Sequence, residues 1–448
     1  GSAVVRTVWD AFLLTGQDPP EGNRADLLID GYIERGPGLG ADLEWARGGL
    51  TGSAFGYWVW DHGEDRLTSG AEIDRDDEHR GIFLLDNRWS RSDRWTLFLE
   101  SAWIYDEAFV DAFFEDLAEE RREFINSAYL RWATGNQLFS IEGRGTLNDF
   151  IANEYLLQSQ GYIVERLPEA RYAIVGQDLG PLAYTGDTRL SRLELQFSEV
   201  TLESQGFDND RRAGAGFGLA PQDRLADVLD AAGIPAGEVL RADSRHTVEL
   251  PLTWGPLNVV PFATGRVTAY DTEFDDLRGP DGPDDQYRLW GAAGVRLDTS
   301  LVRTNDAARS ELFDVRRLRH IVEPSVTVWS AGTSIESDQF PVYDRSVERI
   351  ADGTVVRLGL RNTWQTKRGR GRNERSVDWI IIDAEYVWSS ADAPEFSPFG
   401  RFVWYRPELS NLGEFIHADA AMRLTDAVTL VGDFRQDTDD NRLATASG

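Results

Sequence analysis

The sequence has no cysteine, one lysine and no long apolar run, and each shortage excludes a class of protein. Without cysteine there is no disulfide, no thiolate metal ligand and no cysteine nucleophile. Lys367 is the only lysine and Arg368 follows it, so a nucleotide-phosphate loop with a Gly-Lys-Ser/Thr core is absent. A membrane helix needs about 20 consecutive apolar residues. Apolar runs such as 379–382 are much shorter, so a helical membrane protein is excluded.

The charge balance is strongly acidic, with 76 acidic against 46 basic residues and a formal net charge of −30. Nucleic-acid binding relies on Lys and Arg to neutralise phosphates, so this balance argues against it. The mean hydropathy is negative, yet 41% of the residues are hydrophobic and 11% aromatic. A transmembrane β-barrel is compatible with these values, because its strands alternate and never build a continuous apolar run.

Apolar and polar residues alternate from one end of the chain to the other, which predicts β-strands. In the segments 288–298 and 356–365, one parity is largely apolar and the other carries arginine. Further alternating segments begin near Ala25, Leu39, Phe55, Trp95, Ser127, Leu138, Thr247, Val259, Ser325, Val377, Ile416 and Val428.

Arginine on the polar parity favours a barrel with a solvated lumen, because in a sandwich core each arginine would need a buried partner. Trp and Tyr bracket the apolar parity, as an interfacial girdle requires. A soluble β protein with these aromatics in its core remains the alternative. The side chains expected to face the lumen are Asp42, Glu44, Arg288, Arg296, Arg357 and Arg361. Those expected to contact lipid are Leu97, Leu99, Val295, Leu297, Leu358 and Leu360.

The predicted strands are separated by connections of two sizes, which fits periplasmic turns and outer loops. The stretches 35–38 and 351–353 suit tight hairpins, whereas 61–77 and 274–286 are long and polar, and 437–441 is a smaller polar stretch.

Two segments, 107–124 and 221–232, have the periodicity of short amphipathic helices that would lie in loops. Pro251 and Pro324 fall within strand-like stretches and predict edges or bulges there. With no linker and no exact repeat, we expect one barrel domain over residues 1–448.

No pattern of catalytic residues stands out. The five histidines are scattered without a His-Glu-x-x-His pair, and there is no Gly-x-Ser-x-Gly elbow. The glycines of 214–218 suit a plain loop better than a dinucleotide site, and the abundant carboxylate pairs suit solvated loops. Calcium at 279–285 is conceivable, although the spacing does not match an EF-hand. We therefore expect no enzyme, no cofactor and no metal site.

One basic cluster, 367–375, interrupts the acidic sequence. It is either a solvated hairpin loop or a contact for lipid phosphates, which arginine can hold with two donors. The candidate phosphate contacts are Lys367, Arg368, Arg370 and Arg372.

Several stretches resemble the barrel of the lipopolysaccharide-assembly outer-membrane protein family, LptD or organic-solvent-tolerance protein. The most specific is His-Ile-Val-Glu-Pro-Ser-Val at 320–326, followed by the Asp-containing loop and strand at 342–366. The strand pair at 25–45, with its Arg-Gly-Pro-Gly turn, is similar to an early hairpin of the family. Shorter similarities lie at 61–66 with 80–81, 95–114 with 147–150, and 167–171 with 180–184, so that the resemblance covers most of 25–406.

The resemblance implies a large antiparallel transmembrane β-barrel with long polar outer loops, in the outer membrane of a Gram-negative bacterium. It implies export of lipopolysaccharide to the outer leaflet through a lateral gate, without bond chemistry. Expected partners are lipopolysaccharide, outer-membrane lipids, a lipoprotein plug like LptE and a periplasmic bridge protein like LptA. The family's N-terminal jelly roll is absent before residue 25, and the last strands of the barrel could lie beyond Gly448. Two alternatives remain: another outer-membrane porin or channel, and a soluble acidic all-β protein that binds or hydrolyses carbohydrate.

Overall fold

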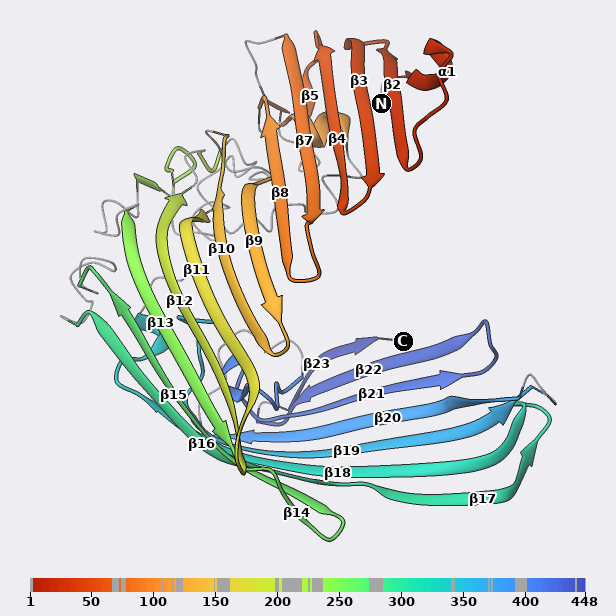
Figure 1. The fold of residues 1–448 in the computed structure, drawn as a ribbon, viewed down its shortest axis with the longest axis vertical. Helices are drawn as coiled ribbons and strands as arrows, with labels where there is room; N and C mark the ends of the chain where they lie inside the picture. The colour runs from red at the N-terminus through yellow and green to blue at the C-terminus, as the bar shows by residue number, and fades with distance from the viewer. Residues whose placement is uncertain are drawn as a thin grey trace. The chain divides into compact units, whose positions relative to one another are not determined.

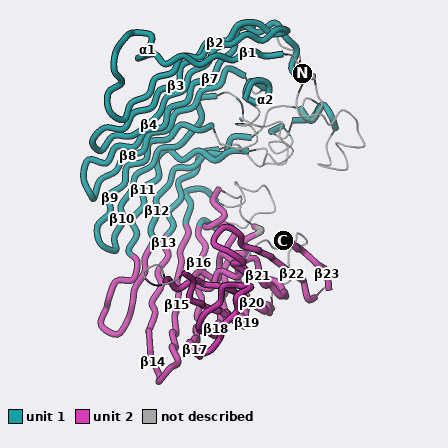
Figure 2. The backbone as a smooth tube through the Cα atoms, turned by 90° about the vertical axis from the view of Figure 1, so that its right-hand side faces the viewer, with its two compact units in different colours: residues 1–174, 187–243, 269–286 teal, residues 175–186, 244–268, 287–448 magenta. Residues whose placement is uncertain are grey.

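A computed structural model gives the fold of the chain (Figure 1). It describes residues 3–447 apart from 67–71, 74–77, 107, 115–116, 118–123, 149, 151–161, 198–200, 204–219, 225, 228–236, 274–284, 340–342, 370, 372–373, 391–400 and 440. Two compact units are present (Figure 2). Unit 1 comprises 1–174, 187–243 and 269–286, and unit 2 comprises 175–186, 244–268 and 287–448.

Unit 1 is built around a meander of antiparallel strands in which each pairs with the next along the chain. These strands are β1 (Val4–Asp10), β2 (Asn23–Tyr32), β3 (Gly36–Arg47), β4 (Leu50–Trp60), β7 (His79–Ser90), β8 (Trp95–Ile104), β9 (Asn126–Thr134), β10 (Gln137–Gly145) and β11 (Tyr162–Leu179). Two short helices, α1 (Ala11–Thr15) and α2 (Phe109–Phe113), and the two-residue strands β5 (Asp65–Arg66) and β6 (Glu72–Ile73) lie in connections.

Unit 2 continues the antiparallel pattern. Its strands are β14 (Leu252–Trp254), β16 (Tyr287–Thr299), β17 (Leu301–Ser310), β18 (Val315–Thr333), β19 (Gly353–Arg368), β20 (Arg375–Ser389), β21 (Phe415–Arg423), β22 (Thr429–Asp437) and β23 (Arg442–Ser447). The strands β11, β12 (Leu182–Phe197), β13 (Glu238–Glu249) and β15 (Leu257–Tyr270) contribute residues to both units. Two 3-10 turns, Ser337–Gln339 and Pro407–Leu409, lie in its connections.

The all-β antiparallel class predicted from the alternation is confirmed. One sheet contains 21 of the strands, and all the pairings described between them are antiparallel. The predicted strands near Ala25, Trp95 and Leu138 correspond to β2, β8 and β10. No helix among the described residues is long and apolar enough to cross a membrane.

Long and short connections alternate along the chain. Strands that run in one direction end in long connections, at 61–78, 105–125, 146–161, 198–237, 271–286, 334–352 and 390–414. Strands that run the other way end in short ones, at 48–49, 91–94, 135–136, 180–181, 255–256, 311–314, 369–374 and 424–428. We call these two strand ends the long-loop end and the short-turn end. The turns at 33–35 and 438–441 are short exceptions at the long-loop end, and the connection 11–22, which contains α1, is a longer exception at the short-turn end.

One predicted hairpin turn is wrong. Residues 351–353 do not reverse the chain between adjacent strands, because the whole connection 334–352 separates β18 from β19. The Asp-Gly pair instead leads into β19, where Gly353 has a φ of 99°. The turn predicted at 35–38 lies slightly earlier, because residues 33–35 join β2 to β3 and Gly36 already pairs with Tyr32.

Pro324 lies inside β18, where the strand changes its partner on one side. β17 pairs with β18 as far as Val322, and β16 takes over from Ser325. A residue without an N–H costs least where the ladder is interrupted, so the predicted bulge or edge is replaced by a change of partner.

The predicted helices survive only in part. The described part of 107–124 contains α2, and in 221–232 residues 226 and 227 are helical while half of the segment lies outside the described residues.

Candidate functional site

Many strands bury charged side chains on one parity, together with some apolar ones, and expose apolar side chains on the other parity. In β13, the side chains of Arg241 and Asp243 are 0% and 3% exposed. Leu240, which precedes Arg241 and points to the other side of the strand, is 44% exposed. In β19, Arg357 is 8% exposed, whereas Leu358 next to it is 47% exposed. A strand of a soluble sheet shows the opposite arrangement, with apolar residues inside and polar residues outside. We call the two sides of the strands the inner (buried) face and the outer (exposed) face.

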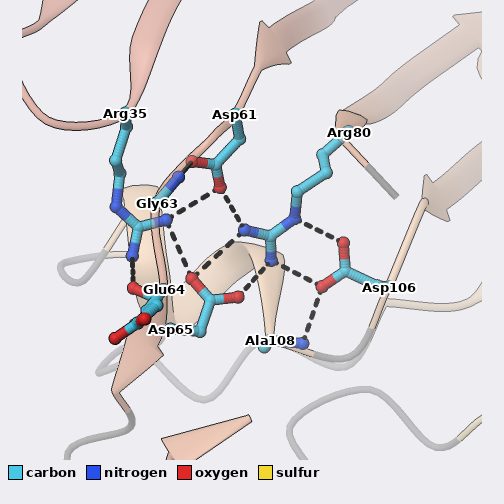
Figure 3. Close-up of polar contacts among 8 residues, drawn as sticks. All are labelled: Arg35, Asp61, Gly63, Glu64, Asp65, Arg80, Asp106 and Ala108. Atoms are coloured by element: carbon cyan, nitrogen blue, oxygen red, sulfur yellow. Dashed lines mark hydrogen bonds and ion pairs between the residues drawn. The ribbon is translucent and has the colours of Figure 1, made fainter. Parts of the chain in front are cut away.

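In unit 1 the inner face carries a buried ion cluster at the long-loop end (Figure 3). Arg80, near the start of β7, has a fully buried side chain. Its guanidinium donates two hydrogen bonds of 2.6 Å to Asp106, after β8. It also contacts Asp61, after β4, at 2.7 Å and Asp65 at 2.9 Å. Arg35, from the β2–β3 turn, contacts Asp61 and Asp65 at 2.9 and 2.8 Å. The cluster therefore ties the β2–β3 turn to the ends of β4, β7 and β8.

Aromatic side chains close the cluster on its other side. The guanidinium carbons of Arg35 and Arg80 lie 4.9 and 5.4 Å from the ring centroid of Phe113 in α2. Phe109, also in α2, is fully buried and joins a core with Tyr57, Val59, Ile82, Leu84, Ala102 and Ile104 from the strands. The connection 105–125 is thus held against the inner face both by apolar contact and by Asp106, which pairs with Arg80.

In unit 2 strand arginines reach to the connection 334–352. Arg288 in β16 is 1% exposed and donates to the carbonyl oxygens of Glu348, at 3.0 Å, and Val347. Arg266 in β15 donates to the carbonyl oxygen of Ser346 at 2.8 Å. Charged donors to carbonyl oxygens make strong hydrogen bonds when water is excluded. They fix the backbone of this connection on the inner face.

A second connection of unit 2, from 401 to 414, is held in a similar way. Arg245 in β13 donates to the buried carboxylate of Glu408 at 2.8 Å. Glu385 in β20 receives the Nε–H of Arg357 at 2.7 Å and the backbone N–H of Phe402 at 3.0 Å. Phe402 packs in a core with Trp290, Trp329, Val355, Val387 and Phe415 from the strands. Polar and apolar contacts therefore combine to hold this connection on the inner face.

An acidic row crosses three adjacent strands beside that connection. Asp383, Asp419 and Asp433 occupy directly opposite positions in β20, β21 and β22. Arg401 reaches into the row and contacts Asp383 at 2.9 Å and Asp419 at 3.0 Å. Burial alone would lower the pKa of Arg401, but the hydrogen bond and charge of Asp383 and the charge of Asp419 raise it above its ordinary value. His417 contacts Asp433 at 2.7 Å.

The residues predicted to face the lumen occupy different environments. Arg288 and Arg357 are buried on the inner face, and Arg296 pairs with Glu249 at 2.5 Å. Arg361 is half exposed and lies 3.8 Å from Asp383. Asp42 and Glu44 both contact Arg24, at 2.6 and 3.2 Å, near the other end of the chain. The structure does not gather these six residues into one site.

The candidate phosphate contacts also separate. Arg368 is buried, and its Nη2 donates to the carbonyl oxygens of Arg423 at 2.6 Å and Leu424 at 3.1 Å, so it braces the β21–β22 turn. Lys367 remains partly exposed and lies 4.0 Å from Glu374. Arg370 and Arg372 lie outside the described residues.

Sequence reasoning did not identify the ion cluster or the arginines that hold the connections. From the sequence, Asp61 stands out only as part of a long polar connection and of a stretch that resembles a known family, and Arg80 only as part of such a stretch. The partners Arg245 and Glu408 are 163 residues apart, and no local pattern links them. An arginine on the inner parity within the first two residues of a strand is the signal that could have pointed to Arg80.

Comparisons with known proteins add little. No family model matches the chain, and no curated protein matches it. Solved structures that match include OprD from Pseudomonas aeruginosa, at 10% sequence identity and a TM-score of 0.28, over 96% of this chain and 92% of that chain. OccAB1 from Acinetobacter baumannii matches at 9% sequence identity and a TM-score of 0.26, over 86% of this chain and 90% of that chain. OmpT, an outer membrane protein of Vibrio cholerae, matches at 8% sequence identity and a TM-score of 0.20, over 99% of this chain and 92% of that chain. TM-scores this low carry no inference about fold or function.

The ion cluster of unit 1 yields a stability prediction. Replacing Arg80 with methionine removes the bidentate partner of Asp106 and one of the two guanidinium groups that contact Asp61 and Asp65. Breaking a buried ion network by removing one partner costs about 3–5 kcal/mol. We expect Arg80→Met to lower the free energy of unfolding by that amount in a urea titration. The matched control Arg35→Met removes a guanidinium that is 14% exposed and should cost less. Equal stability of Arg80→Met and the unaltered chain would contradict the assigned role of this cluster.

Proposed function

We propose that the chain forms an antiparallel β-barrel in the outer membrane of a Gram-negative bacterium and carries cargo across it without changing covalent bonds. The observation that carries the proposal is the reversed burial of the strands. Leucines of the outer face are exposed in both units, among them Leu39, Leu240, Leu289, Leu358 and Leu360. Lipid is the solvent that favours such a face, while the charged inner face suits a polar lumen.

The spacing of exposed aromatics matches the thickness of a membrane. On β8, Trp95 and Trp103 are both exposed on the outer face and are separated by eight residue steps, about 26 Å along a strand. In unit 2, the cross-strand pairs Val356↔Trp388 and Trp364↔Ile380 bracket the outer face of β19 and β20 at the same separation. An outer-membrane barrel has an apolar band about 25 Å tall between two aromatic girdles.

The alternation of connections gives the chain an orientation in that membrane. Outer-membrane barrels have short periplasmic turns and longer extracellular loops. The short-turn end would therefore face the periplasm and the long-loop end the cell exterior. The connections 334–352 and 401–414 then become outer loops that fold back over the inner face of unit 2, held by Arg266, Arg288 and Arg245.

For the cargo we propose lipopolysaccharide, exported to the outer leaflet. The support is the resemblance of 320–326 and 342–366 to the LptD family. These segments belong to β18, to β19 and to the connection 334–352 that joins them. An LptE-like lipoprotein plug and an LptA-like periplasmic bridge would be the partners. The alternative is a passive channel for small solutes, which the same charged inner face also favours.

The membrane placement can be tested at Leu358. Arginine on the lipid-facing side near the midplane of a barrel costs about 2–4 kcal/mol. We therefore expect Leu358→Arg, two residues from the midplane position Leu360, to lower the free energy of unfolding in lipid bilayers by up to about that amount. The control Arg345→Leu changes an exposed residue of the connection 334–352 and should have little effect. If Leu358→Arg were as stable as the unaltered chain in bilayers, the outer face would not be in lipid.

The cargo can be tested by depletion of the full-length protein in its own cells. We expect lipopolysaccharide to disappear from the cell surface, and sensitivity to large apolar antibiotics to rise, because the outer leaflet loses its barrier lipid. A photo-crosslinker at Arg361, which is half exposed, should capture lipopolysaccharide. Normal surface lipopolysaccharide combined with reduced uptake of small solutes would instead establish the passive channel.

A further inference from the structure

The short-turn tip of β17, β18 and β19 places three cations side by side. Arg309 is directly opposite Arg316, and Arg316 is directly opposite Lys367. Residues directly opposite one another in an antiparallel pair lie on the same side of the sheet, and like charges there are destabilising. We call Arg309, Arg316 and Lys367 the basic row. It stands out in a chain whose net charge is −30.

Neighbouring carboxylates neutralise the basic row only weakly. Arg316 lies 3.5 Å from Asp314, and Lys367 lies 4.0 Å from Glu374, and both carboxylates are about half exposed. Arg309 is exposed, and no ion pair of its side chain is found among the described residues. Ion pairs this long and this exposed contribute little. Arg316 also donates a 2.7 Å hydrogen bond to the carbonyl oxygen of Gly369, which leaves the rest of its guanidinium and the side chains of Arg309 and Lys367 to bind an additional anion.

Two irregularities of the strands lie beside the row. β18 shifts register between Arg316 and Leu318, where Arg317 has a φ of 56°, and β19 shifts against β20 between Trp364 and Gln365. A β-bulge of this kind re-aims side chains and is frequent next to functional sites. A non-glycine residue at positive φ also costs energy that the surroundings must supply. Both features distinguish this tip from the regular strands above it.

The tip lies just beyond the apolar band of the outer face. Lys367 is three residues past Trp364, about 10 Å along the strand. The head-group layer on each side of a bilayer extends about 5–8 Å beyond the hydrocarbon. The basic row is thus within reach of phosphate groups at the membrane surface and of those on a lipid that approaches from the same side.

We propose that the basic row binds the phosphate groups of a phosphorylated lipid at the short-turn end. This inference rests on the proposed function, which places that end in the periplasm and makes a phosphorylated lipid the cargo. Arginine is suited to the task because its guanidinium holds phosphate with two parallel hydrogen bonds. The basic cluster at 367–375 predicted candidate phosphate contacts in this region. Because Arg368 is buried, we assign the contact to Arg309 and Arg316 together with Lys367.

The test measures binding by the purified, detergent-folded protein. The ligands are intact lipopolysaccharide, lipopolysaccharide with its phosphates removed, and nanodiscs of phosphatidylglycerol or phosphatidylcholine. The variant is Arg309→Gln with Arg316→Gln. The matched control, Arg345→Gln with Arg349→Gln, removes two exposed arginines from the connection 334–352. Arg309→Gln alone is added because no described polar contact of its side chain would be lost on substitution.

We expect the double variant to bind intact lipopolysaccharide about tenfold more weakly, since charge-assisted hydrogen bonds are lost and each tenfold corresponds to 1.4 kcal/mol. The single variant should show a smaller loss and the control none, and binding should weaken as salt increases. Preferential binding of phosphatidylglycerol over lipopolysaccharide would support the phosphate site. It would also show that the bound phosphate comes from phospholipids of the surrounding membrane leaflet.

Equal binding of intact and dephosphorylated lipopolysaccharide, or unchanged affinity in the double variant, would overturn the phosphate site. The depletion experiment separates this outcome from failure of the proposed function. If depletion removes surface lipopolysaccharide while the double variant binds normally, export stands and the basic row is not its phosphate contact. If depletion leaves surface lipopolysaccharide intact, the proposed cargo fails whatever the variants bind.

Discussion

The interaction on which the rest of the structure depends is the pairing of guanidinium groups on the inner face of the strands. A buried charge is tolerated only when it is paired and hydrogen-bonded. Arg80, Arg288 and Arg357 are each almost fully buried, and each has its partners within the same unit. Some of those partners belong to long connections, so satisfying the arginines requires these connections to fold onto the strands. Charge on the strands and order in the loops are therefore coupled.

This coupling explains why both units have mixed cores. Each core combines strand residues of the inner face with aromatic or aliphatic residues from a connection, Phe109 and Phe113 in unit 1 and Ile350 and Phe402 in unit 2. The ion pairs lie beside these apolar contacts and are screened from water by them. Low local dielectric strengthens satisfied hydrogen bonds and penalises unsatisfied ones. A connection released from the inner face would expose both an apolar surface and an unpaired arginine.

The strands could be predicted from the sequence wherever the alternation of apolar and polar residues was strong. The ion pairs of the inner face could not be predicted in this way. β8 begins at Trp95, where the alternation begins, because one parity is apolar over its length apart from Ser101. β17 was missed, because Arg303, Thr304, Asn305 and Asp306 place polar residues on both faces. Contacts such as Arg245 with Glu408 depend on how a long connection folds back onto the strands, and local periodicity does not predict that path. The basic cluster was visible as composition, but the exposure of its members depended on strand register and on the bulge at Arg317.

The central claim is that the outer face of these strands lies in lipid while the inner face does not. Nitroxide labels placed one at a time along β8 in a reconstituted bilayer test it most directly, through collisions with oxygen and with a water-soluble nickel complex. The account predicts that labels at Leu97, Leu99 and Ser101 collide mainly with oxygen. Labels at Thr96 and Glu100 should be poorly accessible to oxygen, giving a period of two residues along the strand. Access of the nickel complex to positions 97 and 99 equal to that of a fully hydrated site would contradict the claim and indicate a soluble β protein.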